Sequence, residues 1–156
     1  MKRRDHIKLT DDERDEFLSG NLNCTLATID ANGFPHLTAM WYALIDGKFH
    51  FATYAKSQKV INLQQNPKCS VLVEDGDTYS TLRGYTVQGR ADIVQDAELA
   101  GDVLIETSKR YAGLDVGAAG ESVEKVIRER GAKRSVIIVQ PEKVMSWDHR
   151  KLGGTY

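Results

Sequence analysis

The chain has 156 residues and a formal net charge of −1; 28% of its residues are charged and 41% are hydrophobic. This length is enough for one domain with its own hydrophobic core, which we expect to span residues 1–156. The near-zero charge gives no overall attraction to nucleic acid or to an anionic membrane, so neither is predicted as a partner.

No feature of the sequence predicts export, membrane insertion or a metal site. No apolar signal core follows the basic residues near the start, and no apolar run reaches membrane-spanning length. Cys24 and Cys69 lie in apolar, strand-like segments and are expected to be reduced and buried, without zinc-ligand spacing. A basic cluster over residues 128–134 is interpreted as solvated surface. We therefore expect a cytoplasmic protein without bound metal.

The first half of the chain alternates between strands and helices. In chain order, we expect a helix over residues 10–20, strands over 22–29, 35–45 and 49–54, and a helix over 57–65. Thr10 and Glu13 form a capping-box pattern at the start of the first helix. Asp46-Gly47 predicts a tight hairpin turn, and Asn66-Pro67 ends the second helix.

The second half continues this alternation. We expect strands over residues 69–73 and 79–94, helices around 100–111 and 123–127, and strands over 135–139 and 144–147. Gly84 and Gly89 are expected at bulges or bends, Pro141 at a turn, and residues 113–120 in a glycine-rich link. Antiparallel strands joined by tight turns, with inserted helices, predict a β-barrel with peripheral helices.

The strand expected over residues 35–45 has no strongly polar face, so we expect both of its faces to be covered. Pro35 begins it, and one face carries His36, Thr38, Met40 and Tyr42. An apolar surface with a few hydrogen-bonding groups suits a flat conjugated ring. The same face also fits a mixed barrel interior in which His36 is structural, and both interpretations stay open.

A short polar loop joins the next strand to a helix. Thr53 and Ser57 offer hydroxyl groups, Lys56 and Lys59 offer positive charge, and a helix start offers free backbone N–H groups. These features indicate an anion site that would hold a phosphate. The alternative is a capped helix with two solvated lysines.

Further candidates lie later in the chain. Tyr79 and Arg83 lie on or near one expected strand and could reach a ligand, across a subunit interface or within one chain. Their alternative role is packing. Trp147 and His149 belong to an aromatic and charged cluster that would cover a pocket or anchor the tail.

Five segments carry a resemblance to a known family: residues 27–36, 51–63, 66–71, 87–91 and 144–156. Together they resemble the pyridoxamine 5′-phosphate oxidase-like split β-barrel superfamily, over residues 10–156. The last segment is similar to the tail of its deazaflavin-using branch. The resemblance implies a mainly β fold with helices, namely a six-stranded antiparallel split β-barrel with peripheral helices.

The resemblance also implies a homodimer with cofactor sites at the subunit interface. Residues 35–42 would line the ring of the cofactor, and Thr53, Ser57 and Lys59 match the phosphate loop, in which Lys59 contacts phosphate. Gln58 stands where the family oxidases usually carry an arginine.

These implications favour an oxidoreductase that transfers hydride from coenzyme F-420, a deazaflavin, to an unsaturated small molecule. His36, Tyr79 and His149 are the candidate proton donors, with solvent as the alternative. Three other hypotheses stay open. They are a flavin mononucleotide (FMN) enzyme of the same fold, a non-catalytic cofactor carrier, and a haem-binding protein that uses His36, His50 or His149.

Overall fold

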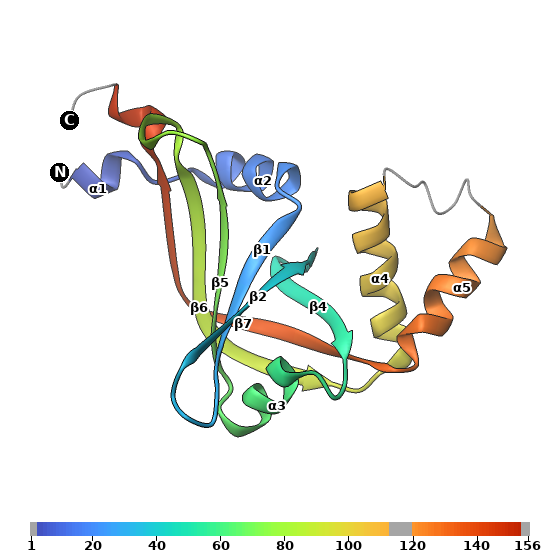
Figure 1. Ribbon diagram of the computed structural model, residues 1–156. Helices are drawn as coiled ribbons and strands as arrows, with labels where there is room; N and C mark the ends of the chain where they lie inside the picture. The colour runs from blue at the N-terminus through green and yellow to red at the C-terminus, as the bar shows by residue number, and fades with distance from the viewer. Residues whose placement is uncertain (1–2, 113–119, 154–156) are drawn as a thin grey trace.

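A seven-stranded antiparallel sheet dominates the computed structural model, which describes residues 3–112 and 120–153 (Figure 1). Its strands are β1 (Asn23–Ile29), β2 (Pro35–Trp41), β3 (Ala43–Ile45), β4 (Lys48–Tyr54), β5 (Lys68–Asp75), β6 (Arg83–Val94) and β7 (Arg134–Asp148). The helices are α1 (Arg3–His6), α2 (Asp11–Gly20), α3 (Gln58–Gln65), α4 (Ala97–Ala112) and α5 (Glu121–Gly131), with 3-10 turns η1 (Tyr79–Thr81) and η2 (His149–Leu152). Residues 113–119 of the expected link lie outside the described residues.

The sheet has the strand order β2-β1-β5-β6-β7-β4-β3. Its two edge strands, β2 and β3, are separated in the chain by Tyr42 alone. The sheet must therefore curl until its edges approach each other, which makes a split barrel, as predicted. The break at Tyr42 divides the strand expected over residues 35–45, so the sheet has seven strands rather than six.

Two other boundaries differ from the prediction. The turn expected at Pro141 is absent, and β7 continues past it because a register shift between Gln88 and Gly89 of β6 accommodates the proline. The register shift confirms the bulge expected at Gly89, where a Cβ would overlap the carbonyl oxygen of Gln140. Tyr79, expected at the start of a strand, lies in η1 instead.

The core fills the inside of the curled sheet. Alternate side chains of β1, β4 and β5 point inward, among them Leu26, Phe51 and Val71, each less than 2% exposed. Phe17 of α2 and Val60 of α3 join the same cluster from the helices. A smaller cluster on the outer side packs α4 against β3 and β7. The helical pair α4–α5 therefore covers the sheet beside β4 (Figure 1).

Tyr42 and Arg110 connect the chain between β2 and β3 to the C-terminal end of α2. The Tyr42 side chain is fully buried, and its hydroxyl lies 2.8 Å from the carbonyl oxygen of Leu18. The Arg110 guanidinium donates to the carbonyl oxygens of Leu18, Asn21 and Tyr42 and lies 4.3 Å from the Tyr42 ring. Since α2 has no basic residue in its last turn, Arg110 of α4 supplies the cation that its C-terminal end favours.

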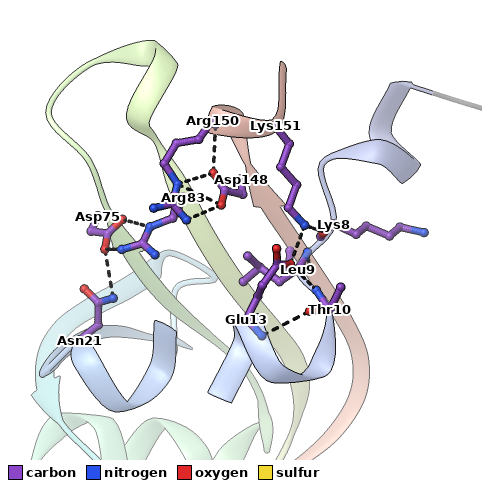
Figure 2. Close-up of polar contacts among 11 residues, drawn as sticks. Lys8, Leu9, Thr10, Glu13, Asn21, Asp75, Arg83, Asp148, Arg150 and Lys151 are labelled. Carbon is purple, nitrogen blue, oxygen red and sulfur yellow. Dashed lines mark hydrogen bonds and ion pairs between the residues drawn. The ribbon is translucent and has the colours of Figure 1, made fainter. Parts of the chain in front are cut away.

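Charged side chains of α2, η2 and the neighbouring strands form ion pairs at the end of the sheet opposite α3 (Figure 2). Arg83 pairs with Asp75, Arg150 with Asp148, and Lys151 with Glu13. Asp148 is only 2% exposed. Burial opposes its ionisation, but hydrogen bonds from Arg150 outweigh this effect and hold the pKa of Asp148 below its usual value of 3.8.

This pairing makes stability depend on acid pH. The pKa of Asp148 is lower in the folded chain than in the unfolded chain, so its stabilising contribution is complete well above pH 3.8 and is lost as the pH falls below it. We expect Asp148→Asn to lower the free energy of unfolding at pH 7 and to shrink its decrease between about pH 5 and pH 3. Urea unfolding of the wild type and the variant at both ends of that range measures the decrease in the free energy of unfolding. A decrease of the same size in both proteins would contradict the prediction.

Candidate functional site

The side chains of Thr53, Ser57 and Lys59 meet where β4 ends and α3 begins. The Lys59 ammonium donates to the Thr53 hydroxyl over 3.2 Å, and that hydroxyl lies 3.4 Å from the Ser57 hydroxyl. Thr53 is only 5% exposed. The sequence predicted this cluster, which we call the anion corner. Lys56, the fourth residue expected there, is exposed and makes no contact with the other three in the described structure.

The anion corner has unused capacity to bind an anion. Burial lowers the pKa of Lys59, and no carboxylate among residues 3–112 and 120–153 pairs with it. Ser57 precedes the first turn of α3, but its side chain caps no backbone N–H there. The first N–H groups of a helix have no acceptor within the helix, so those of Gln58 and Lys59 can donate to a ligand. A phosphate would satisfy all of these donors.

A cavity of about 440 Å³ lies beside the last residues of β2. Its lining comes from β2, β4, α4, α5 and β7: Ala39, Met40, Trp41, Ala52, Leu104, Thr107, Ser108, Ile127, Arg130 and Arg134. Consecutive residues of β2 take part, although their side chains alternate between faces, so the cavity follows the open edge of the strand. Unpaired backbone N–H and C=O groups along such an edge can bind the polar rim of a flat ring.

A second hollow, of about 450 Å³, adjoins this cavity and reaches Tyr54 at the end of β4. The two hollows share Arg130 and Arg134, and the second adds Tyr54, Val126, Glu129 and Lys133. Tyr54 follows Thr53 in β4 and pairs with Arg134 across the strands. The anion corner and this hollow therefore use successive residues of β4, Thr53 and Tyr54, whose side chains point to opposite faces of the strand.

The ring wall predicted on β2 is only partly found. His36, Thr38 and Met40 share the half-buried face, with the His36 ring nitrogen 3.5 Å from the Thr38 hydroxyl, but Met40 alone of these lines the cavity. Pro35 is exposed at the start of the strand. The ring-binding role predicted for Tyr42 is wrong, since its fully buried side chain lies in the core, against which Met40 also packs. Ala39 and Trp41, on the opposite face, line the cavity instead.

Tyr79, Arg83 and His149 lie at the far end of the sheet. Along β7, Ser135 pairs with Thr53 and Asp148 pairs with Arg83. About 43 Å of strand, measured along β7 at roughly 3.3 Å per residue, separates these two positions. Tyr79 and His149 contact each other, with ring centroids 4.4 Å apart. They could join the anion corner only through a second copy of the chain, which stays a prediction.

The arginines of the cavity were missed because the cluster over residues 128–134 was interpreted as solvated surface. That interpretation fits Arg128, which pairs with Asp102 and Glu124. It is wrong for Arg134, whose Nε is buried. No spacing in the sequence signalled them, because Arg130 lies in α5 and Arg134 begins β7. Only the pairing of β4 with β7 shows that Arg134 lies opposite Tyr54.

Other types of site receive no support from the described residues. Cys24 and Cys69 are buried free thiols, and burial raises the pKa of Cys24 to about 12. No three histidine, cysteine or acidic side chains in the described parts of the chain are grouped as metal ligands. None of the helices described is long and apolar enough to cross a membrane.

Comparisons with known proteins extend these observations. A family model described as pyridoxamine 5′-phosphate oxidase matches residues 10–148. The crystal structure of the conserved hypothetical protein Rv2991 from Mycobacterium tuberculosis is 40% identical, covering 100% of this chain and 95% of that chain, with a TM-score of 0.89. An F-420 reductase is 29% identical, covering 83% and 94%, with a TM-score of 0.63.

The haem storage protein HutZ from Vibrio cholerae is 19% identical, covering 87% of this chain and 94% of that chain, with a TM-score of 0.66. This likeness shows a shared fold alone. No curated protein matches the chain.

Proposed function

Because the chain belongs to the pyridoxamine 5′-phosphate oxidase family, we propose that it is an oxidoreductase that uses coenzyme F-420 to reduce an unsaturated small molecule. The observation that carries this proposal is the anion corner at the end of β4, where the next residue, Tyr54, borders a hollow that shares Arg130 and Arg134 with the cavity along the edge of β2. The similarity to an F-420 reductase, at 29% identity, supports a deazaflavin as the ring cofactor.

The residues present fit such a cofactor. Lys59, Ser57 and Thr53, with the N–H groups that begin α3, would hold its phosphate. The edge of β2 and the Trp41 and Ala52 side chains would hold the ring and exclude water from one of its faces. When bound in reduced form, the deazaflavin supplies the hydride.

Gln58 bears on the choice between F-420 and FMN. The family oxidases usually carry an arginine at this position, next to the phosphate-binding lysine. Here the Gln58 amide donates to the Asn62 side chain over 2.8 Å, one turn further along α3. The corner therefore receives one cation fewer than an FMN phosphate site of that type, which favours F-420.

The proposal includes a homodimer. Edge strand β2 and the turn before it expose Phe34, Leu37 and Trp41, which are 69%, 64% and 56% accessible. A second copy covering this face would remove a large apolar surface from water and close the open side of the cofactor site. It would also offer a way for Tyr79 and His149 to reach the ring.

A non-catalytic F-420 carrier is the second candidate, and a specific observation favours it. Among the described residues that line the cavity there is no histidine, tyrosine or carboxylic acid to protonate a product. His36 is on β2 but outside the lining, so water would be the proton donor within one chain.

Titration of the purified protein with F-420 and with FMN tests the proposal. We expect F-420 to bind at tens of micromolar or below, and FMN to bind more weakly because of Gln58. Absence of F-420 binding in that range would overturn the proposal. Turnover of reduced F-420 with enones, quinones or nitroaromatic compounds would then separate an enzyme from a carrier.

A further inference from the structure

The arginines of the cavity differ from most others in the chain in having no acidic partner. Carboxylates pair with five arginines elsewhere: Arg14, Arg83, Arg90, Arg128 and Arg150. Within residues 3–112 and 120–153, neither Arg130 nor Arg134 forms an ion pair, although both line the cavity. Their positive charge is therefore left without a counter-charge in the described structure.

Arg134 is held in place with donors unused. Its guanidinium lies 4.5 Å from the centre of the Tyr54 ring, and one terminal nitrogen is 3.4 Å from the carbonyl oxygen of Ala52. Its Nε is buried and has no hydrogen-bond partner in the part of the chain that the structure describes. A buried donor without an acceptor is costly, so a ligand that accepts from this guanidinium gains affinity.

The surroundings decide what kind of acceptor fits. No carboxylate among the described residues lines the 440 Å³ cavity, and Leu104 and Ile127 make part of its wall apolar. A planar guanidinium binds a carboxylate through two parallel hydrogen bonds, whereas an ammonium acts as a point charge. Lys59 in the anion corner and Arg134 in the cavity thus suit two different anions.

We propose that the cavity binds the carboxylate of an unsaturated organic acid through Arg134 and Arg130. This inference rests on the proposed function, because it leaves the anion corner to the phosphate of the cofactor. In the reaction, one carbon of the double bond of the acid gains hydride from reduced F-420, and the other gains a proton from water. The carboxylate orients the acid and is unchanged.

Calorimetric titration of the cofactor-free protein with cinnamate and with cinnamamide tests the binding directly. The two probes differ in charge but hardly in shape. We expect cinnamate to bind about tenfold or more tightly than the amide. Arg134→Gln and Arg130→Gln should each reduce that preference, and Arg134→Lys should restore only part of it because it lacks the planar fork.

Arg128→Gln is the matched control, since Arg128 is on the same helix as Arg130 but pairs outside the cavity. Equal binding of the two probes to the wild-type protein, or the same loss in Arg128→Gln, would overturn the inference. Melting curves show whether Arg134→Gln and Arg130→Gln are folded. If one of them is unfolded, the binding preference of the other decides the result.

A second titration separates the carboxylate of an acceptor from those in the glutamate tail of F-420. Wild type and Arg134→Gln are compared for F-420 with and without its tail. We expect the substitution to change both affinities by the same factor. If Arg134→Gln instead lost a preference for F-420 with its tail while cinnamate binding stayed unchanged, the arginine would bind the tail, and the inference would be overturned. Failure of F-420 to bind at all would instead count against the proposed function, because the cinnamate experiment needs no cofactor.

Discussion

Replacing Lys59 by alanine is expected to weaken F-420 binding by about 1–3 kcal/mol, roughly 5- to 150-fold in the dissociation constant. The Lys59 ammonium is half-buried, contacts the Thr53 hydroxyl and has no carboxylate partner in the described structure. A phosphate in the anion corner would therefore lose a charge-assisted hydrogen bond. Titration of the variant under the conditions used for the wild type measures the change.

Lys48→Ala provides the control for the loss of one charge. Lys48 begins β4 at the end opposite the anion corner, so this variant should bind F-420 as the wild type does. We also expect Lys59→Ala to fold normally, because burial disfavours the charged form of Lys59, as the direction of its pKa shows. An unchanged dissociation constant for Lys59→Ala would place the phosphate elsewhere.

The anion corner could be predicted because its parts are close in sequence. Thr53, Ser57 and Lys59 span seven residues at a strand-to-helix junction, and such a junction has few possible geometries. The same locality explains why the capping box of Thr10 and Glu13 is found as predicted. Local hydrogen bonding determines both features, so no knowledge of tertiary structure was needed.

Features that depend on distant segments were not predictable in the same way. Alternation placed Tyr42 on the same side as Met40, but it did not show that this side faces the core or that the strand breaks between β2 and β3. The role of Arg134 depends on its pairing with Tyr54, eighty positions earlier in the chain. The α4–α5 wall of the cavity likewise depends on how those helices pack on the sheet. The sequence shows helical periodicity there, but not the surface that the helices cover.

Arg110→Met should have the largest effect on stability of the substitutions proposed, lowering the free energy of unfolding by about 2–4 kcal/mol. The guanidinium donates to carbonyl oxygens of Leu18 and Asn21 at the end of α2 and of Tyr42 at the strand break. Methionine has a side chain of similar length but no N–H group to donate to these three carbonyl oxygens. The Tyr42 hydroxyl can still donate to one of these carbonyls, which limits the loss.

Lys109→Met distinguishes this interpretation from a general effect on α4. Lys109 neighbours Arg110 on the same helix, and its exposed ion pair with Glu106 should contribute less than about 1 kcal/mol. Urea unfolding measures the free energy of unfolding of both variants. An equal decrease in the two would show that Arg110 does not join the barrel to α2.

The same pair of variants links the stability of the barrel to the cofactor site. Tyr111 follows Arg110 and stacks on Trp41 of the cavity, with ring centroids 3.7 Å apart. If Arg110 positions this end of α4, Arg110→Met should weaken F-420 binding even under conditions where the variant is fully folded, whereas Lys109→Met should not. Wild-type affinity in folded Arg110→Met would show that the cavity keeps its shape without this contact.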